Sequence, residues 1–180
     1  MSVLKNTRCY LAGNLQYEDI SVAISWRTFV SDRLKEIEIR CLSPLDKVFA
    51  NFEPENSDFQ KEIKSMILRG DLNEAHARVK NIIRKDLAMV DHSNFVICVL
   101  DEKKPTFGTV NELVLARQLN KPVFITCKGG LSAIPIWLVG MFKPTCFFKD
   151  LQSIVDRIFK INLSLESISN EQWRIFEEGY

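Results

Sequence analysis

Short apolar runs alternate with segments of helical periodicity along most of this sequence, and this alternation constrains the fold more than any other feature. Apolar runs predict strands at 9–13, 39–42, 94–100, 122–126 and 146–148. Apolar residues three or four positions apart predict helices at 18–37, 59–69, 71–90, 109–119 and 151–161. Strands that alternate with helices form βαβ units, so we predict an α/β fold. We expect a doubly wound, flavodoxin-like parallel five-stranded sheet with helices on both faces.

The predicted helix at 18–37 carries apolar side chains at helical intervals, with Phe29 fitting the spacing less regularly. They are Ile20, Ala23, Ile24, Phe29, Val30, Leu34 and Ile37. Trp26, Phe29, Phe95 and Phe124 also occupy positions compatible with the core.

The length of 180 residues suits one domain with a C-terminal arm. We predict that the domain spans residues 1–161 and that residues 162–180 form the arm. The larger apolar side chains of the arm are Trp173, Ile175, Phe176 and Tyr180. Because these side chains are too apolar to remain in water, we expect the arm to close over its own pocket or to dock on a neighbouring subunit.

Charge and cysteine content restrict the class of partner and the compartment. The chain has 24 basic and 23 acidic residues, whereas proteins that bind nucleic-acid phosphates carry a clear basic excess. No run approaches the ~20 apolar residues of a membrane span, and residues 1–8 lack a signal-peptide pattern. The five cysteines show no CxxC spacing and are typical of free thiols. We therefore predict a cytoplasmic protein that binds neither nucleic acid nor membranes.

Several common site motifs are absent from the sequence. His76 and His92 are too isolated for a zinc centre, so no metal is predicted. Neither GxxxxGK[ST] nor GxGxxG occurs, which argues against a P-loop or a dinucleotide site. The absence of GxSxG excludes a hydrolase nucleophile elbow.

Glu112 is the candidate that remains where the central predicted strand leads into the helix at 109–119. In doubly wound sheets, ligands bind outside the carboxyl ends of the strands. We predict that Glu112 lies in the first turn of its helix, where the helix dipole favours an ionised carboxylate. On spacing alone, this residue could equally be one that only stabilises its helix.

Several short motifs resemble those of the nucleoside 2-deoxyribosyltransferase family. They are Tyr10-Leu11-Ala12-Gly13, Asp86, Gly108-Thr109-x-x-Glu112 and Lys121-Pro122-Val123. Their order and spacing agree with that family over about residues 9–123, including the 26 positions from Asp86 to Glu112. The segment 176–180 is similar to the acidic, Tyr-terminated tail of some members.

The resemblance implies an enzyme and a mechanism. Members of the family cleave the N-glycosidic bond of 2′-deoxynucleosides, hold the sugar on a Glu, and transfer it to another nucleobase. The matching nucleophile is Glu112, Asp86 matches a proton carrier for the base, and Tyr10 matches a tyrosine that orients the nucleophile. From the residues alone, Tyr10 could be a strand-end aromatic and Asp86 a solvated helix residue. Transfer of a sugar through a carboxylate requires no cofactor.

The resemblance also implies substrate-binding residues and an assembly. The residues that match or border its motifs are Gly13, Asn14, Thr106, Gly108, Thr109, Trp137 and Tyr180. The carboxylate of Tyr180 would reach toward the bound base. Family members form dimers or hexamers, and residues 134–137, with Trp137, are the candidate segment that completes a neighbour's site. An equally good interpretation of this segment is hydrophobic packing.

Two departures from the family pattern leave the substrate open. Thr106 replaces an Asp that contacts the sugar; related N-glycosidases of 2′-deoxynucleoside 5′-monophosphates bind phosphate with a hydroxyl residue there. Lys103 and Lys104 would add positive charge, but the loop at 13–16 lacks the Arg and paired glycines of that phosphate cradle, and Asn14 replaces a common Pro. The alternatives to a transferase are thus such a hydrolase or a non-catalytic nucleotide-sensing module. Residues 46–58, expected to shape the base pocket, show no pattern that identifies the base.

Overall fold

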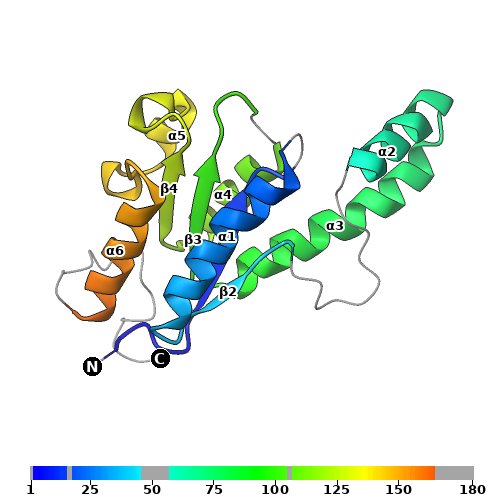
Figure 1. Ribbon diagram of the computed structural model, residues 1–180. Coiled ribbons are helices and arrows are strands. Elements are labelled where there is room, and N and C mark those ends of the chain that lie inside the picture. Colours follow the sequence, from blue (N-terminus) through cyan, green and yellow to red (C-terminus); the bar gives the residue numbers. More distant parts are fainter. Residues whose placement is uncertain (1, 16–17, 46–56, 105–106, 165–180) are drawn as a thin grey trace.

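A four-stranded parallel sheet forms the centre of the molecule (Figure 1). The computed structural model describes residues 2–15, 18–45, 57–104 and 107–164. The strands are β1 (Arg8–Gly13), β2 (Arg40–Leu42), β3 (Phe95–Leu100) and β4 (Val123–Cys127). Their order in the sheet is β2-β1-β3-β4, and each neighbouring pair is parallel. The α/β class and the parallel sheet are therefore as predicted.

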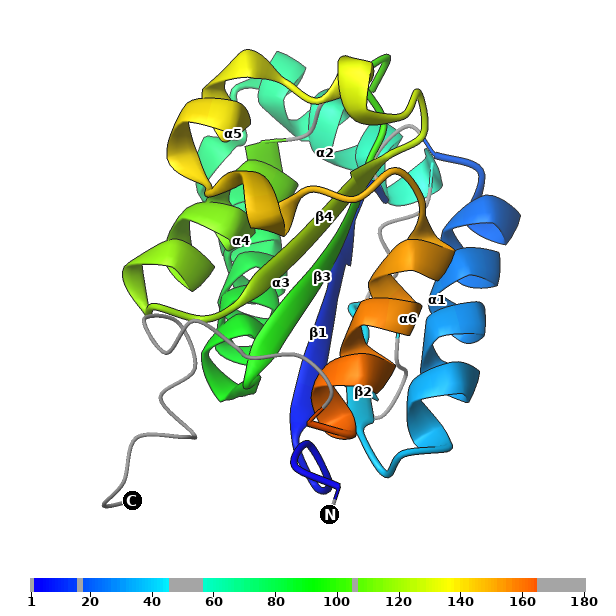
Figure 2. The same cartoon turned by 90° about the vertical axis from the view of Figure 1, so that its left-hand side faces the viewer.

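Helices cover both faces of this sheet, as Figure 2 shows. They are α1 (Ile20–Lys35), α2 (Ser57–Arg69), α3 (Leu72–His92), α4 (Phe107–Gln118), α5 (Ile136–Met141) and α6 (Leu151–Asn162). Two short 3-10 turns span Leu131–Ala133 and Pro144–Cys146. Helices α1 and α6 lie on one face, and α3 and α4 lie on the other. Each predicted helix is present, with ends that differ from the predicted ones by a few residues.

The alternation of side chains along β3 explains why helices are needed on both faces. Phe95 and Ile97 join the core under α1 and α6, whereas Val96 and Cys98 join the core under α3 and α4. All four side chains are fully buried. A strand that is apolar on both faces is stable only between two helical layers. The continuous apolar run in the sequence therefore marks the centre of the sheet.

The fifth predicted strand, at 146–148, is not a strand of the sheet. Cys146 ends the 3-10 turn that begins at Pro144, and only Phe147 forms a bridge, parallel to Ile125 of β4. The backbone N–H of Phe148 donates to the carbonyl of Ile125. Because residues 144–146 form this turn, they cannot extend the pairing with β4. The prediction of five strands is therefore corrected to four strands and a single bridge.

Helix α1 buries some of the apolar side chains that the sequence places at helical intervals and leaves others exposed. Its buried positions are Ala23, Arg27, Val30 and Leu34, which follow a regular helical spacing with an arginine in an apolar row. Ile20 and Ile24 are 55% and 48% exposed, and Phe29 is 37% exposed. The prediction that Phe29 occupies a core position is wrong, because Phe29 lies outside the row of α1 that faces the sheet.

Helices α2 and α3 form a hairpin that extends beyond the sheet (Figure 1). Gly70 between them has a φ of +84°, a left-handed conformation that glycine adopts without strain. Asp71 occupies the predicted cap position of α3, but its side chain makes no capping hydrogen bond and pairs with Arg69 instead. The hairpin has its own apolar cluster, centred on Phe59, Ile63 and Met66.

Two predicted segments fall wholly or partly outside the described residues. The loop at 46–58 is described only from Ser57 onward, and the arm at 162–180 only as far as Ser164. Asn162 itself ends α6 and is buried, where its side chain accepts hydrogen bonds from Ser2 and the backbone of Leu4. Among the helices in the described ranges, none has the length and apolar character needed to cross a bilayer.

Candidate active site

Tyr10 and Glu112 meet beneath the carboxyl edge of the sheet. Tyr10 lies in the middle of β1 and is fully buried, and Glu112 projects from α4 with only 7% of its surface exposed. The hydroxyl of Tyr10 donates a hydrogen bond of 2.8 Å to Oε1 of Glu112. The two residues are 102 positions apart in the sequence. The structure thus brings together two of the three predicted catalytic residues.

Glu112 lies one turn further into its helix than predicted. Helix α4 begins at Phe107, which places Glu112 in the second turn instead of the first. The field of a helix dipole falls off within the first turn, so the dipole contributes less to the ionisation of this carboxylate than the sequence suggests. The hydrogen bond from Tyr10 helps to orient Glu112.

The protonation state of Tyr10 is set by its surroundings. Burial raises the pKa of Tyr10 well above its ordinary value, and the negative charges of Glu112 and Asp86 and the hydrogen bond to Glu112 raise it further. The positive charge of Arg27 opposes this shift. Tyr10 therefore keeps its proton at every physiological pH and remains a donor to Glu112.

Asp86, the third predicted catalytic residue, lies on α3 in the same electrostatic neighbourhood. Asp86 as a whole is half-buried, and its Oδ1 atom is buried. The charge of Asp86 acts on Tyr10 and on Arg27, raising the pKa of each. Helix α3 packs beside α4 and β1. The 26-residue spacing in the sequence therefore corresponds to two side chains that approach β1 from neighbouring helices.

Arg27 is a buried cation that the sequence analysis missed. It lies on α1 with 3% of its surface exposed, and its guanidinium donates to three backbone carbonyls. The partners are Gly13 at 3.0 Å, Ala23 at 2.9 Å and Leu11 at 3.4 Å. The group also stacks on the ring of Trp26, 4.3 Å from its centroid. Arg27 thus anchors the carboxyl end of β1 from the face opposite to α4.

The charge of Arg27 is balanced by the predicted catalytic residues. Burial lowers its pKa to about 10, whereas the negative charges of Glu112 and Asp86 raise it. It is therefore still protonated at neutral pH. A buried cation without neighbouring negative charge costs several kcal/mol. The regular spacing of Ala23, Arg27 and Val30 is the signal from which Arg27 could have been found.

Gly13 ends β1, as predicted, and Asn14 follows it; the role of both residues in binding substrate stays a prediction. A Cβ atom on Gly13 would lie 2.8 Å from the carbonyl oxygen of Val99 and 2.9 Å from Trp26 Cζ2, so no larger residue fits between β3 and α1. Asn14 is buried, and its side-chain amide donates to the backbone carbonyl of Lys104. Asn14 therefore ties the loop after β1 to the loop after β3.

Three of the remaining predicted substrate-binding residues lie in the described part of the chain. Gly108 and Thr109 lie in the first turn of α4, where Thr109 is buried and Gly108 has open space around it. Trp137 lies on α5 and is 84% exposed. Thr106 and Tyr180 lie outside the described residues. The role of these five residues in binding substrate stays a prediction.

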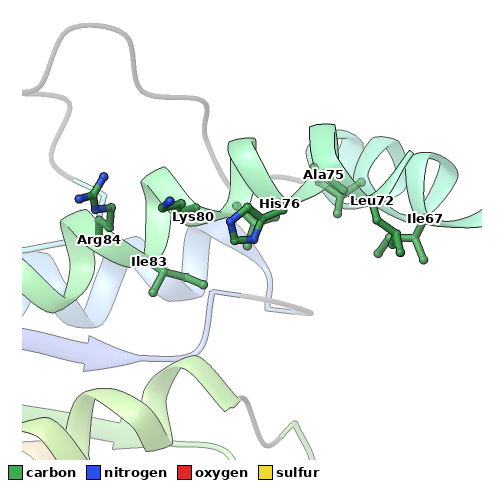
Figure 3. Close-up of a pocket in the computed structure, with 9 residues that line it drawn as sticks. Ile67, Leu72, Ala75, His76, Lys80, Ile83 and Arg84 are labelled. Carbon is green, nitrogen blue, oxygen red and sulfur yellow. The ribbon is translucent and has the colours of Figure 1, made fainter. Parts of the chain in front are cut away.

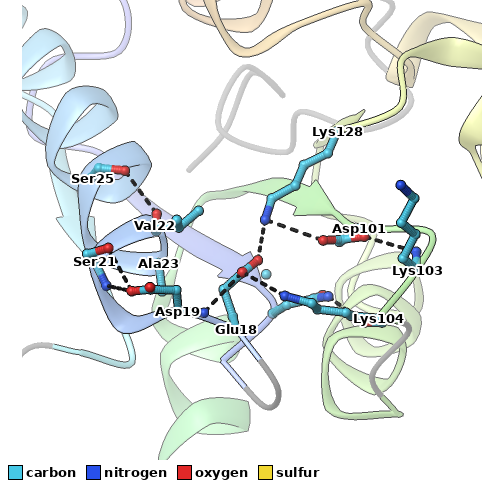
Figure 4. Close-up of polar contacts among 12 residues, drawn as sticks. Glu18, Asp19, Ser21, Val22, Ala23, Ser25, Asp101, Lys103, Lys104 and Lys128 are labelled. Carbon is cyan, nitrogen blue, oxygen red and sulfur yellow. Dashed lines mark hydrogen bonds and ion pairs between the residues drawn. The ribbon is translucent and has the colours of Figure 1, made fainter.

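An ion-pair network lies on the loops above this edge (Figure 4). The carboxylate of Glu18, which precedes α1, contacts the ammonium groups of Lys104 and Lys128. Lys128 also lies 3.4 Å from Asp101. The sequence analysis assigned positive charge to Lys104 but did not anticipate Glu18 as its partner.

A separate groove of 480 Å³ lies on the hairpin of α2 and α3 (Figure 3). The described residues that line it include Ile67, Leu72 and Ile83, with Lys80 and Arg84 at its side. None of these lining residues belongs to the predicted site. The described part of the chain also contains no cluster of three or more His, Cys, Asp or Glu side chains suited to a metal.

Comparison with known proteins bears directly on this arrangement. No curated protein matches the sequence significantly. The structure is similar to that of a 2-deoxyribosyltransferase from the psychrotolerant bacterium Bacillus psychrosaccharolyticus, with a TM-score of 0.56 and 15% identity. The match covers 83% of this chain and 90% of that one, and at this identity it shows a shared fold. The sequence model of nucleoside 2-deoxyribosyltransferases matches residues 9–142, a range that contains Tyr10, Asp86 and Glu112. The chain belongs to the nucleoside 2-deoxyribosyltransferase family.

Proposed function

We propose that this protein is an N-deoxyribosyltransferase that moves 2-deoxyribose from one nucleobase to another through a covalent intermediate on Glu112. The observation that carries the proposal is the buried 2.8 Å hydrogen bond from Tyr10 to Glu112. A hydrogen bond from a buried hydroxyl to one carboxylate oxygen restricts the orientation of the group, as a nucleophile requires. Membership in a family of nucleoside 2-deoxyribosyltransferases supports the same chemistry.

The first half-reaction breaks the bond between C1′ and the base. A carboxylate oxygen of Glu112 forms a bond to C1′ as the C1′–N bond breaks, and the electron pair of that bond passes to the base nitrogen. Asp86, in its acid form, gives its proton to the departing base. A carboxylate beneath the ring also stabilises the positive charge that develops at C1′ in the transition state.

The second half-reaction reverses these steps with a different base. A nitrogen of the acceptor base attacks C1′, the ester bond to Glu112 breaks, and the proton of the acceptor returns to Asp86. Tyr10 keeps Glu112 oriented in both steps. Arg27 binds the carbonyl of Gly13, at the carboxyl end of the strand that carries Tyr10. Each step uses side chains of this chain alone, so the proposed reaction requires no metal or organic cofactor.

The test is a product analysis with a 2′-deoxynucleoside and a different free base. A new deoxynucleoside is expected, and Glu112→Ala is expected to abolish its formation while the circular dichroism spectrum is retained. Free deoxyribose as the sole sugar product would contradict transfer and favour hydrolysis. Parallel incubation with a 5′-monophosphate would then identify an N-glycosidase of monophosphates. Tight nucleoside binding without turnover would indicate the non-catalytic module.

We further propose that the protein forms a homo-oligomer in which α5 meets a neighbouring subunit. Ile136 and Trp137 are adjacent on this short helix and are both more than four-fifths exposed, a costly arrangement for large apolar side chains in water. The predicted arm at 162–180 is a second candidate contact. Light scattering should give a dimer or hexamer mass, and Trp137→Ser should reduce it. A monomeric mass for the parent protein would contradict this assembly.

A further inference from the structure

The network around Glu18 joins three loops that follow three neighbouring strands. Glu18 lies between β1 and α1, Asp101 and Lys104 lie between β3 and α4, and Lys128 follows β4. Oε1 of Glu18 is 3.2 Å from Lys104 Nζ, and Oε2 contacts Lys128 Nζ. The Glu18 side chain is only 6% exposed, whereas each lysine is more than a third exposed. Figure 4 shows the carboxylate between the two ammonium groups.

We call Glu18, Asp101, Lys104 and Lys128 the rim, because their loops lie at the carboxyl edge of the sheet, above the candidate active site. The amide of Asn14 donates to the carbonyl of Lys104, and Asn14 directly follows Gly13, whose carbonyl is held by Arg27. The same strands and loops therefore position both the rim and the Tyr10–Glu112 pair.

Glu18 occupies a position that suits an anion with several oxygens. Two ammonium groups that converge on one carboxylate are also the arrangement that would bind a phosphate. Burial raises the pKa of Glu18, but hydrogen bonds from Lys128 and Lys104 outweigh this effect and lower it, so the carboxylate is ionised at neutral pH. Asp101 supplies a second carboxylate to Lys128. The two carboxylates cancel the formal charge of the two lysines.

On the basis of the proposed function, we propose that Glu18 is a specificity-determining residue that disfavours 5′-phosphorylated substrates. The 5′ carbon of a furanose is attached at C4′, across the ring oxygen from C1′, so a 5′ phosphate extends away from Glu112 toward the rim. There it would meet two lysines already neutralised by Glu18 and Asp101, and the carboxylates of these two residues would repel the phosphate. An uncharged 5′ hydroxyl would not be repelled. Proteins discriminate between ligands by such repulsive groups as well as by attractive contacts.

The test compares kcat/KM for a deoxynucleoside and for its 5′-monophosphate in Glu18→Gln. The ratio of monophosphate to nucleoside kcat/KM is expected to rise at least about tenfold, the value of one charge-assisted hydrogen bond. Asp19→Asn is the matched control, because it removes the same charge one residue away and keeps an N-cap for α1. An unchanged ratio in folded Glu18→Gln overturns the proposal.

A second measurement separates this proposal from the proposed function. In calorimetric titrations with inorganic phosphate, Glu18→Gln should bind more tightly than the parent, and Glu18→Gln with Lys128→Gln should lose the gain. Asp101→Asn, which keeps an acceptor for the backbone N–H of Lys103, should show a smaller gain. These results would support the anion position even if no substrate were turned over. No gain in either single variant would overturn it.

Discussion

The carboxyl edge of the sheet contains two charged groups of residues that differ in their access to water. Beneath the edge, Tyr10, Arg27 and Glu112 are nearly inaccessible. Above it, the lysines that pair with Glu18 are about a third exposed. Charge–charge interactions are several-fold stronger in a protein interior than near its surface. The buried group can therefore fix geometry and reactivity, whereas the rim network can adjust which ligands enter and is weakened by salt.

Removing the charge of Glu112 should have the largest effect on activity. Glu112→Gln keeps an acceptor for Tyr10 but is a poor nucleophile, so turnover should fall at least about 10⁴-fold with the fold retained. Steady-state kinetics of deoxynucleoside cleavage measure the effect. Glu74→Gln, in the first turn of α3 on the hairpin, removes the same charge elsewhere and should have parent activity. Activity near the parent level in Glu112→Gln would remove this residue from the mechanism.

Loss of the buried cation should have the largest effect on stability. Arg27→Met removes the donors to the carbonyls of Leu11, Ala23 and Gly13, and should lower the free energy of unfolding by about 2–5 kcal/mol. Urea denaturation measures this change. Arg33→Met on the same helix breaks a surface pair with Glu36 and a contact of the guanidinium with the Phe159 ring, and should cost about 1 kcal/mol. Equal losses of unfolding free energy in the two variants would mean that the burial of Arg27 does not increase its contribution to stability.

Loss of the Tyr10 hydroxyl should have an intermediate effect on activity. Tyr10→Phe removes one hydrogen bond to a carboxylate, so kcat/KM should fall about 10- to 100-fold. A value close to that of the parent would mean that Glu112 needs no orientation by Tyr10.

The same variant tests the raised pKa of Tyr10. The unfolded tyrosine loses its proton near pH ~10 while the native one keeps it, so this stabilising contribution is complete below about pH 10 and is lost as the pH rises further. Unfolding at several alkaline pH values should therefore give a steeper decline for the parent than for Tyr10→Phe. Identical slopes would contradict the buried, protonated state of Tyr10.

The rim should contribute least to stability. Glu18→Gln is expected to change the free energy of unfolding by about 1 kcal/mol or less at neutral pH, and less at high salt. Because the pairing with Lys128 and Lys104 lowers the pKa of Glu18, its contribution is present above the ordinary value of 4.5 and is lost as the pH falls through the lower native value. The parent and the variant should therefore become equally stable in acid. A difference that persists there would show that Glu18 acts through packing.

The fold could be predicted closely because its signals are local. The apolar run that contains β3 and the helical spacing in α3 and α4 each reflect the burial of neighbouring residues. The fifth strand was wrong because Pro144 and Cys146 form a turn whose pairing with β4 depends on tertiary contacts. Glu112 was predicted in the first turn of α4 and lies in the second, because the sequence does not mark the start of this helix clearly.

The candidate site could be predicted in part. Tyr10, Asp86 and Glu112 were found through a family resemblance, and the structure brings Tyr10 and Glu112 into direct contact. Arg27 and Glu18 were missed because each is recognised by what surrounds it. An arginine in an apolar row resembles an exposed position, and a glutamate before a helix resembles an ordinary first-turn residue.

By itself, the sequence determined the α/β class, the order of the elements along the chain and the family to which the protein belongs. Only the tertiary structure decided which charged groups share a low-dielectric interior and which meet at the surface. The physical reason is that periodicity and motif spacing are properties of neighbouring residues. The electrostatic environment of Glu112 or Glu18, in contrast, depends on side chains contributed by strands, helices and loops distant in the sequence.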